Sequence, residues 1–209
     1  MIGDTLLIGL ISDTHIGYPS DILPPHIKGA SFGQGVRLTE LPQKVLDAFK
    51  GVDLILHAGD FYLPLVLDQL ETVAPVLATW GDDDVLADFG DDSRIRKRQA
   101  FVFEGVTLWL THVKPTFWLI DPDDEWYFLD SELEDPDNPE APQHPPDIIV
   151  HGHTHFAAID TLQEANHDKD ILVVNPGSAT FPNYVAKLGS VGLLTLESGK
   201  IGMKIVPLD

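Results

Sequence analysis

The sequence predicts an α/β fold built as a sandwich of two sheets, and three features of the pattern lead to this prediction. Short runs that are apolar at every position are typical of strands covered on both faces. In the first half of the chain, helix-like stretches separate these runs, and this alternation is typical of α/β folds. The second half holds a series of strand-like segments and few helix-like ones.

The first half supplies the alternating part of this pattern. Apolar runs at residues 5–12, 52–57 and 74–79 are expected to form buried strands. Helix-like stretches at residues 41–50 and 64–72 lie between them, and each has a proline near its start, where a helix tolerates proline best. The expected order is therefore strand, helix, strand, helix, strand.

The second half is expected to continue almost entirely with strands. These are residues 99–105, 106–111, 147–150, 156–162, 171–174, 191–196 and 201–206. The first two would be joined tightly at Glu104-Gly105, and residues 197–200 would form a hairpin turn between the last two. No repeat or internal boundary interrupts the pattern, so residues 1–209 are expected to form one domain.

Two long segments, residues 18–39 and 114–146, are expected to be loops of that domain. The first is rich in proline and glycine, and the second holds seven prolines, many acids and an aromatic cluster between residues 117 and 128. Loops of this length in a compact domain usually carry a function, and the aromatic residues argue against plain disorder. The 114–146 insert could cover the site, form a surface for a protein partner, or pack on the body as an ordered flap.

The composition excludes several classes of function. There are 33 acidic and 13 basic residues, so no broad basic surface exists for nucleic acid. The basic run at residues 94–98 is expected to be a solvated helix face rather than a phosphate-binding patch. The absence of cysteine excludes disulfides, thiol catalysis and cysteine-rich zinc sites. With no apolar run of membrane-span length and no basic secretory start, a cytoplasmic protein is expected.

Acidic and histidine side chains follow several of the expected strands, at the point where each strand ends. They are Asp13, His15, Asp60, Asp82, Asp83, Asp84, His112, His151, His153 and His155. Ligand sites of α/β sheets lie beyond the carboxyl ends of the strands, so these side chains are expected to meet at one rim. All are metal-ligand types, and most are costly to bury without a partner.

The histidines at 151, 153 and 155 are the strongest single signal. In an extended segment, this alternation would place the three side chains on one side. A pH switch is the alternative to a metal site here. The many carboxylates favour a hydrolytic two-metal centre over a structural zinc site.

Taken together, these motifs resemble the calcineurin-like metallophosphoesterase superfamily, in its small single-domain phosphodiesterase branch. The matching elements are Asp13-x-His15, Gly59-Asp60, Gly81-Asp82-Asp83-Asp84, His112, Gly152-His153-Thr154-His155 and Asn175-Pro176-Gly177-Ser178. The resemblance covers residues 5–206 apart from the two long loops. It implies a four-layer α/β/β/α sandwich, in which helices flank two mixed sheets.

The resemblance also implies a site for two divalent metal ions. Asp13, His15 and His155 would hold the first ion, His112, His153 and Asp82 would hold the second, and Asp60 would bridge them. Manganese is the first expectation, and iron, zinc, nickel or cobalt would also suit these ligands. The ions would lie roughly 3.5–4 Å apart, and the attacking group would be metal-bound hydroxide.

Two positions depart from the family pattern. Asp82 stands where the family usually has asparagine, and the added negative charge would favour monoanionic diesters over dianionic monoesters. Asp83 stands where many relatives carry a histidine that protonates the leaving group. It could act as that acid if its acidic neighbours raise its pKa, or it could simply shape the loop. His151 is the other candidate acid or phosphate contact.

The sequence therefore predicts a phosphodiesterase that acts on a small or nucleotide-like substrate. A phosphomonoesterase is the alternative within the same class. A non-catalytic protein-binding scaffold of the same fold is the alternative from another class. Every expected ligand position still carries a metal-binding side chain, and this favours the enzyme.

Overall fold

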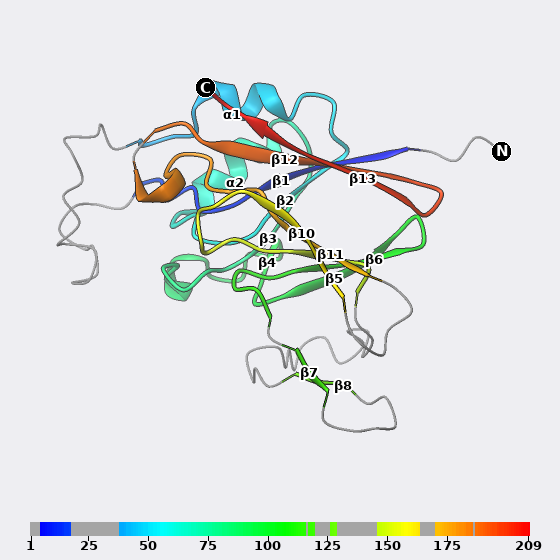
Figure 1. Cartoon of the computed structure of the whole chain (residues 1–209). Helices are drawn as coiled ribbons and strands as arrows, with labels where there is room; N and C mark the ends of the chain where they lie inside the picture. The colour runs from blue at the N-terminus through cyan, green and yellow to red at the C-terminus, as the bar shows by residue number, and fades with distance from the viewer. Residues whose placement is uncertain are drawn as a thin grey trace.

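The computed structural model describes residues 5–17, 38–115, 117–119, 126–128, 146–163, 170–185 and 187–209. In these ranges two larger sheets lie face to face with an apolar layer between them (Figure 1). The expected loop at residues 18–39 lies almost wholly outside the described residues. So does most of the 114–146 insert, including the side chains proposed as a partner surface, although β7 (Phe117–Leu119) pairs antiparallel with β8 (Trp126–Phe128) inside it.

The first sheet has six strands in the order β13-β12-β1-β2-β3-β4. Their bounds are Leu6–Ile11 for β1, Leu54–His57 for β2, Val76–Thr79 for β3, Ile95–Arg96 for β4, Ser190–Glu197 for β12 and Lys200–Pro207 for β13. Strands β1 to β4 run parallel, whereas β12 and β13 join as an antiparallel hairpin beside β1. The sheet is therefore mixed.

The second sheet has five strands in the order β10-β11-β9-β6-β5. Their bounds are Gln99–Phe103 for β5, Val106–Leu110 for β6, Ile148–Val150 for β9, Ala158–Leu162 for β10 and Ile171–Asn175 for β11. The central strand β9 is parallel to both neighbours, and the outer pairs are antiparallel. The tight connection at Glu104-Gly105 is confirmed as the turn between β5 and β6.

The two α-helices of the described residues, α1 (Gln43–Ala48) and α2 (Pro64–Glu71), pack on the outer face of the first sheet. This explains why β1 is apolar throughout: Leu7 and Ile11 pack on the helix side, whereas Ile8 and Leu10 face the second sheet. The predicted α/β fold with two mixed sheets is confirmed. Neither described α-helix is long and apolar enough to cross a membrane.

The basic run at residues 94–98 is not a helix face, and this expectation was wrong. It contains the short strand β4, which pairs with β3. Arg94 forms an ion pair of 2.7 Å with Asp68 of α2, and the buried Arg98 guanidinium lies 5.1 Å from the ring centre of Trp109. Both arginines therefore have partners inside the protein, which a solvated face would not provide.

Strand register brings the ends of several strands to one rim. His57 at the end of β2 pairs with Ile11 at the end of β1 and with Ala78 near the end of β3. In the second sheet, Leu110 and Val150 pair at the ends of β6 and β9. Because these neighbours are parallel, the segments that follow them leave each sheet at the same edge.

Candidate metal centre

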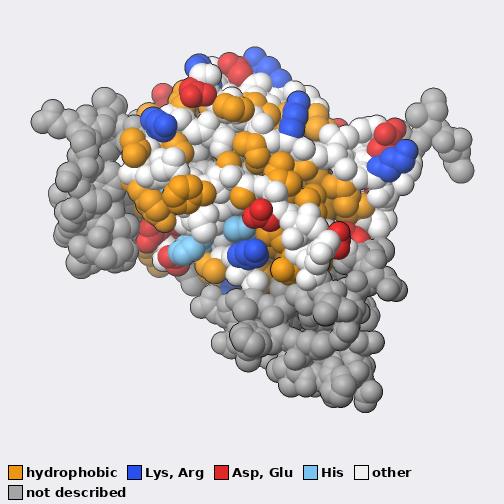
Figure 2. Space-filling view, in the orientation of Figure 1, with side chains coloured by type: hydrophobic (Ala, Val, Ile, Leu, Met, Phe, Trp, Pro, Cys, Tyr) orange, Lys and Arg blue, Asp and Glu red, His pale blue; other side chains and the backbone are white. Residues whose placement is uncertain are grey.

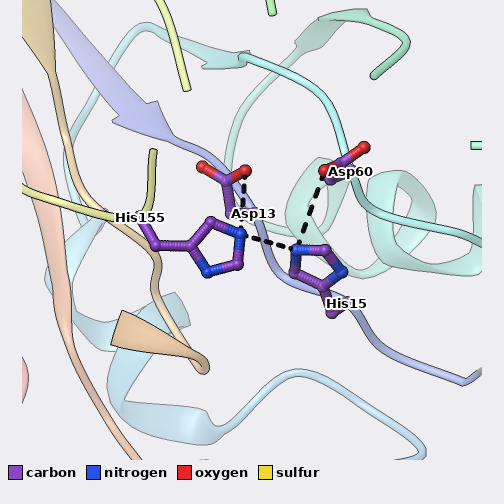
Figure 3. Close-up of side chains that lie close together, drawn as sticks. All are labelled: Asp13, His15, Asp60 and His155. Atoms are coloured by element: carbon purple, nitrogen blue, oxygen red, sulfur yellow. Dashed lines mark hydrogen bonds and ion pairs between the residues drawn. The ribbon is translucent and has the colours of Figure 1, made fainter. Parts of the chain in front are cut away.

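Seven of the predicted side chains form two groups at this rim. Asp13, His15, Asp60 and His155 make up the first cluster (Figure 3), and Asp82, His112 and His153 make up the second cluster. In each cluster, one potential ligand atom from every residue lies within 4.8 Å of the others. Residues from five separate strand ends thus reach the distances at which one cation can contact all members of a cluster.

In the first cluster, two histidine nitrogens face each other and suit a cation-binding site. The Nε2 atoms of His15 and His155 are 3.0 Å apart. The Oδ2 atom of Asp60 lies 3.8 Å from the His15 nitrogen, and Oδ1 of Asp13 lies 3.5 Å from the His155 nitrogen. Two imidazole nitrogens and two carboxylate oxygens that converge in this way suit a divalent ion.

In the second cluster, Asp82 lies between two histidines. Its Oδ1 atom is 2.8 Å from His112 Nε2 and 2.9 Å from His153 Nδ1. The His112 Nε2 atom is buried and makes no well-formed hydrogen bond within the described part of the chain. A buried nitrogen that faces carboxylate oxygens without a well-formed hydrogen bond is the kind of atom that a metal ion satisfies.

Asp60 connects the two clusters. Its Oδ2 atom lies 3.8 Å from His15 Nε2 and 3.3 Å from His112 Nε2. The Asp60 side chain is almost fully buried. One carboxylate thus approaches a histidine of each cluster, as the predicted bridging role requires.

The backbone at the centre is locally strained. Non-glycine residues rarely adopt a positive φ angle, and in these positions the strain is held by the surrounding fold. Residues of the two clusters with such angles are Asp13 (52°), His15 (44°), Asp60 (57°), His153 (68°) and His155 (60°).

The strain also corrects one expectation. The 151–155 segment is not extended, because His153 and His155 both have a positive φ. Their side chains therefore diverge, so that His155 joins the first cluster and His153 joins the second. His151 joins neither cluster, and its Nδ1 lies 3.1 Å from the Gly152 carbonyl.

Two glycines make room for the carboxylates. A Cβ at Gly81 would lie 2.0 Å from Asp60 Oδ1, and a Cβ at Gly152 would lie 2.8 Å from Asp13 Oδ2. Any larger residue would collide with the carboxylate unless the loop moved. These two glycines explain why Gly-Asp and Gly-His pairs recur in the motifs.

The second ring nitrogens of three histidines are held by neighbours. The Ala58 carbonyl accepts a hydrogen bond of 2.7 Å from His112 Nδ1, and the Phe181 carbonyl accepts one of 2.8 Å from His155 Nδ1. The Tyr62 hydroxyl lies 2.5 Å from His15 Nδ1. Contacts of this kind fix the ring orientation and leave Nε2 free for a metal.

The clusters differ in how their charges are balanced. In the first cluster, burial and the nearby Asp60 raise the pKa of Asp13 to about 7, and burial lowers the pKa of His15 to about 3. In the second cluster, burial works against a charged His112, but the carboxylates of Asp60 and Asp82 raise its pKa well above the ordinary value. A divalent ion would favour ionised carboxylates and neutral imidazoles in both places.

Asp83 and His151, the predicted catalytic residues, lie beside the clusters. The Asp83 backbone N–H donates a hydrogen bond of 3.0 Å to Asp60 Oδ1, which fixes its loop next to the bridging residue. Burial lowers the pKa of His151 to about 4, so its ring is neutral at pH 7. A catalytic role for either side chain stays a prediction.

Asp84 is a positioning residue, a role that the sequence did not distinguish from that of a metal ligand. Its Oδ2 accepts backbone hydrogen bonds from Asp60 (2.9 Å) and Gly81 (2.8 Å), and its Oδ1 accepts one from Tyr62 (2.7 Å). It thereby ties the loop after β2 to the loop after β3. The run of three aspartates was visible in the sequence, but nothing in it showed which aspartate would bind metal and which would accept hydrogen bonds from the backbone of the two loops.

Comparisons with known proteins agree with this geometry. A family model described as the calcineurin-like phosphoesterase superfamily domain matches residues 6–199. A probable metallophosphoesterase of Methanothermobacter thermautotrophicus is 32% identical over 203 residues, which is 96% of this chain and 92% of that protein. Another, from Methanocaldococcus jannaschii, is 29% identical over 100% of this chain and 85% of that protein.

Solved structures share the fold. YfcE, a phosphoesterase from E. coli, has a TM-score of 0.53 at 19% identity, over 98% of this chain and all of that one. Entamoeba histolytica Vps29 complexed with zinc has a TM-score of 0.52 at 19% identity, again over 98% of this chain and 100% of that chain. At these identities the likeness concerns the fold alone.

Proposed function

The chain belongs to the calcineurin-like phosphoesterase superfamily, and on this premise we propose that it is a phosphodiesterase that works with two divalent metal ions. The observation that carries the proposal is the pair of clusters joined by Asp60. The alternatives are a phosphomonoesterase and a non-catalytic scaffold.

The donor set indicates which residues would hold the ions. The first cluster would bind one ion, and the second cluster would bind the other, with Asp60 between them. The bound ions would supply Lewis-acid polarisation of the phosphoryl group and a water of lowered pKa. The mixed nitrogen and oxygen ligands suit manganese first, and iron, zinc, nickel or cobalt as well.

The chain's own residues would orient these ligands and the substrate. Tyr62 and the carbonyls of Ala58 and Phe181 hold three histidine rings in place. The backbone of Asp83 is tied to Asp60, and in this proposal its side chain would deliver a proton to a leaving group near the second cluster. The neutral ring of His151 would serve as a contact to the substrate rather than as a proton donor at pH 7.

The preference for diesters is proposed from Asp82. Its carboxylate lies within 2.9 Å of both histidines of the second cluster, so its negative charge belongs to the site. With two divalent ions, the carboxylates of Asp13, Asp60 and Asp82 leave one positive charge before any hydroxide binds. A site of low net charge attracts a dianionic monoester less strongly relative to a monoanionic diester.

The test is the hydrolysis of bis(p-nitrophenyl) phosphate by protein stripped of metal and then supplied with Mn²⁺. We expect turnover that depends on the metal and falls to the baseline in Asp60→Ala. The matched control is Asp88→Ala, which removes an exposed aspartate outside both clusters and should keep the wild-type rate.

The result also separates the alternatives. Turnover of p-nitrophenyl phosphate, with little turnover of the diester, would replace the proposal with a phosphomonoesterase. No turnover of either ester with any of the named metals would favour the scaffold.

A further inference from the structure

Tyr184 contacts one residue of each cluster without belonging to either cluster. Its ring stacks on the ring of His155, with centroids 4.4 Å apart and an angle of 21° between the planes. Its hydroxyl lies 3.5 Å from the carbonyl oxygen of His153. One aromatic side chain thus borders a residue of the first cluster and a residue of the second.

Much of this ring is open to solvent. Tyr184 is 57% exposed, although one face of the ring covers His155. Phe181 packs at 90° to the ring, with centroids 6.1 Å apart, and still leaves more than half of Tyr184 exposed. Figure 2 shows one face of the molecule, where histidine and acidic side chains reach the surface among hydrophobic side chains. A large aromatic ring whose only need was packing would be expected to bury more of its area.

The backbone that presents the ring is strained. Asn183 and Tyr184 have φ angles of 53° and 58°, and a bulky residue rarely adopts the left-handed region. Two hydrogen bonds hold the turn, from the Tyr184 N–H to the Phe181 carbonyl (3.2 Å) and from the Val185 N–H to the Pro182 carbonyl (3.0 Å). Such strain persists where the surrounding structure fixes it, and it concentrates at binding sites.

We propose that the open face of Tyr184 binds a planar ring carried by the ester group of the substrate. The site would then select phosphoesters with an aromatic or heterocyclic ring near the phosphorus. This inference rests on the proposed function, because the two clusters place the phosphoryl group. An aromatic side chain accepts any flat ring on its face, so it would select the ring as a class.

The alternative role of Tyr184 is to orient His155 alone. In that case its removal would weaken every phosphoryl ligand to the same degree. A ring-binding role instead predicts a loss confined to ligands that carry a ring. The two roles can therefore be separated by comparing matched ligands with and without a ring.

The experiment is isothermal titration calorimetry on the Mn²⁺-loaded protein. The probes are methylphosphonate, cyclohexylphosphonate, phenylphosphonate and adenosine 5′-phosphorothioate. We expect at least one of the two flat-ring ligands to bind the wild type about tenfold more tightly than methylphosphonate. Tighter binding of phenylphosphonate would place the substrate's ring next to the phosphorus, whereas tighter binding of adenosine 5′-phosphorothioate would place it beyond a sugar. Cyclohexylphosphonate controls for bulk and should not share the gain.

Two substitutions and one control complete the design. Tyr184→Asn removes the ring and keeps a residue that tolerates the left-handed backbone, so the fold should persist, as thermal unfolding will show. It should abolish the gain for flat rings and leave the affinity for methylphosphonate unchanged. Tyr184→Phe should keep the gain, and Val185→Ala, at the exposed neighbour, should change nothing.

Two results would overturn the inference. One is equal affinity of the wild type for ligands with and without a flat ring. The other is an equal loss for all ligands in Tyr184→Asn, which would assign Tyr184 to the orientation of His155. The three phosphonates have a P–C bond in place of the ester, so their binding is measured without turnover. A failure of metal-dependent hydrolysis would therefore count against the proposed function and would not affect the comparison among these three ligands.

Discussion

The two clusters of the centre are built from the same residue types but differ in exposure. In the first cluster, Asp13, Asp60 and His155 are buried and His15 is nearly so. In the second cluster only His112 is buried, whereas the side chains of His153 and Asp82 are 45% and 56% exposed. The first cluster is therefore preformed inside the protein, whereas the second cluster is open to solvent and substrate. We expect the buried half to bind its ion more tightly.

Removing one histidine from each cluster should give the largest effect. His155→Ala should leave no ion bound after dialysis, because it removes a buried ligand of the tight site. His153→Ala should retain one ion per chain. Turnover should fall in both variants by about a thousandfold, since a metal supplies several kcal/mol of charge stabilisation, but excess Mn²⁺ should restore it only in His153→Ala. Elemental analysis and rate measurements test this, and identical behaviour of the two variants would contradict the comparison.

Tyr62 offers a subtler change to the buried half. Tyr62→Phe removes the hydroxyl that lies 2.5 Å from His15 Nδ1 and leaves every direct ligand in place. Loss of such an outer contact typically weakens metal binding by about 10–100-fold. We expect that loss for the tighter ion in a competition with a chelator, while the weaker ion is unaffected. Tyr184→Phe is the control, and equal affinities in Tyr62→Phe and wild type would refute the assignment.

The buried side chain of His57 should make the free energy of unfolding of the metal-free protein depend on pH in the acidic range. Burial lowers the pKa of His57 to about 3, and its ring lies 3.2 Å from the Thr14 hydroxyl. The unfolded chain takes up this proton near pH 6.5, but the folded protein does so only near pH 3. Stability from His57 is therefore present above pH 6.5 and is lost as the pH falls through that window, by about 1.4 kcal/mol per pH unit.

The matched variant for this prediction is His57→Asn. Its side-chain carbonyl can still accept the Gly59 N–H that His57 Nδ1 now accepts. The pKa values of Asp13 and Asp84 are raised to about 7, so these two groups lower the stability of the folded protein as the pH rises from 4 to 7. Because both proteins contain them, the contribution of His57 is read from the difference in unfolding free energy between wild type and variant. In guanidinium unfolding between pH 4.5 and pH 6.5, wild type should gain more stability with pH than the variant. Equal slopes would count against a buried neutral His57.

Asp82→Asn should give the smallest effect, on the exposed half. The substitution removes one negative charge and keeps the shape of the side chain. An interaction of about 1 kcal/mol with a further substrate charge corresponds to a shift of about fivefold. We expect the ratio of diester to monoester hydrolysis to fall by that order in steady-state assays. A ratio that does not change would remove the physical basis for the diester preference.

The sequence was most informative where burial dominates. Strands β1, β2 and β3 are apolar at nearly every position because each is covered on both faces, and the ligands follow directly at their ends. The strand pattern brought ten acidic and histidine side chains to one rim, and the resemblance to the metallophosphoesterase family then implied which seven of them would hold metal. The positive φ angles at His153 and His155, which let two nearby histidines reach different clusters, could not be predicted from the sequence.

Contacts between residues far apart in the chain could not be predicted. Tyr62 is 47 positions from His15, and neither residue type nor spacing signals their contact. Pro182-Asn183 signals a turn, but neither the positive φ of Tyr184 nor the stacking of its ring on His155 can be read from the sequence. The basic run at residues 94–98 was misjudged for the same reason, since the acidic partner Asp68 comes from α2.

The place of β1 in the first sheet has a consequence for how the protein is made. Leu6 to Leu10 pair with Gly192 to Leu196 near the other end of the chain, and the Ser178 hydroxyl donates a hydrogen bond of 2.6 Å to the Asp13 carbonyl. During synthesis, β1 can pair with β2 early, but it lacks its second neighbour until β12 has left the ribosome. The nascent chain therefore carries all seven cluster residues before it can hold them in place, and the metal centre can form only after β12 has been made.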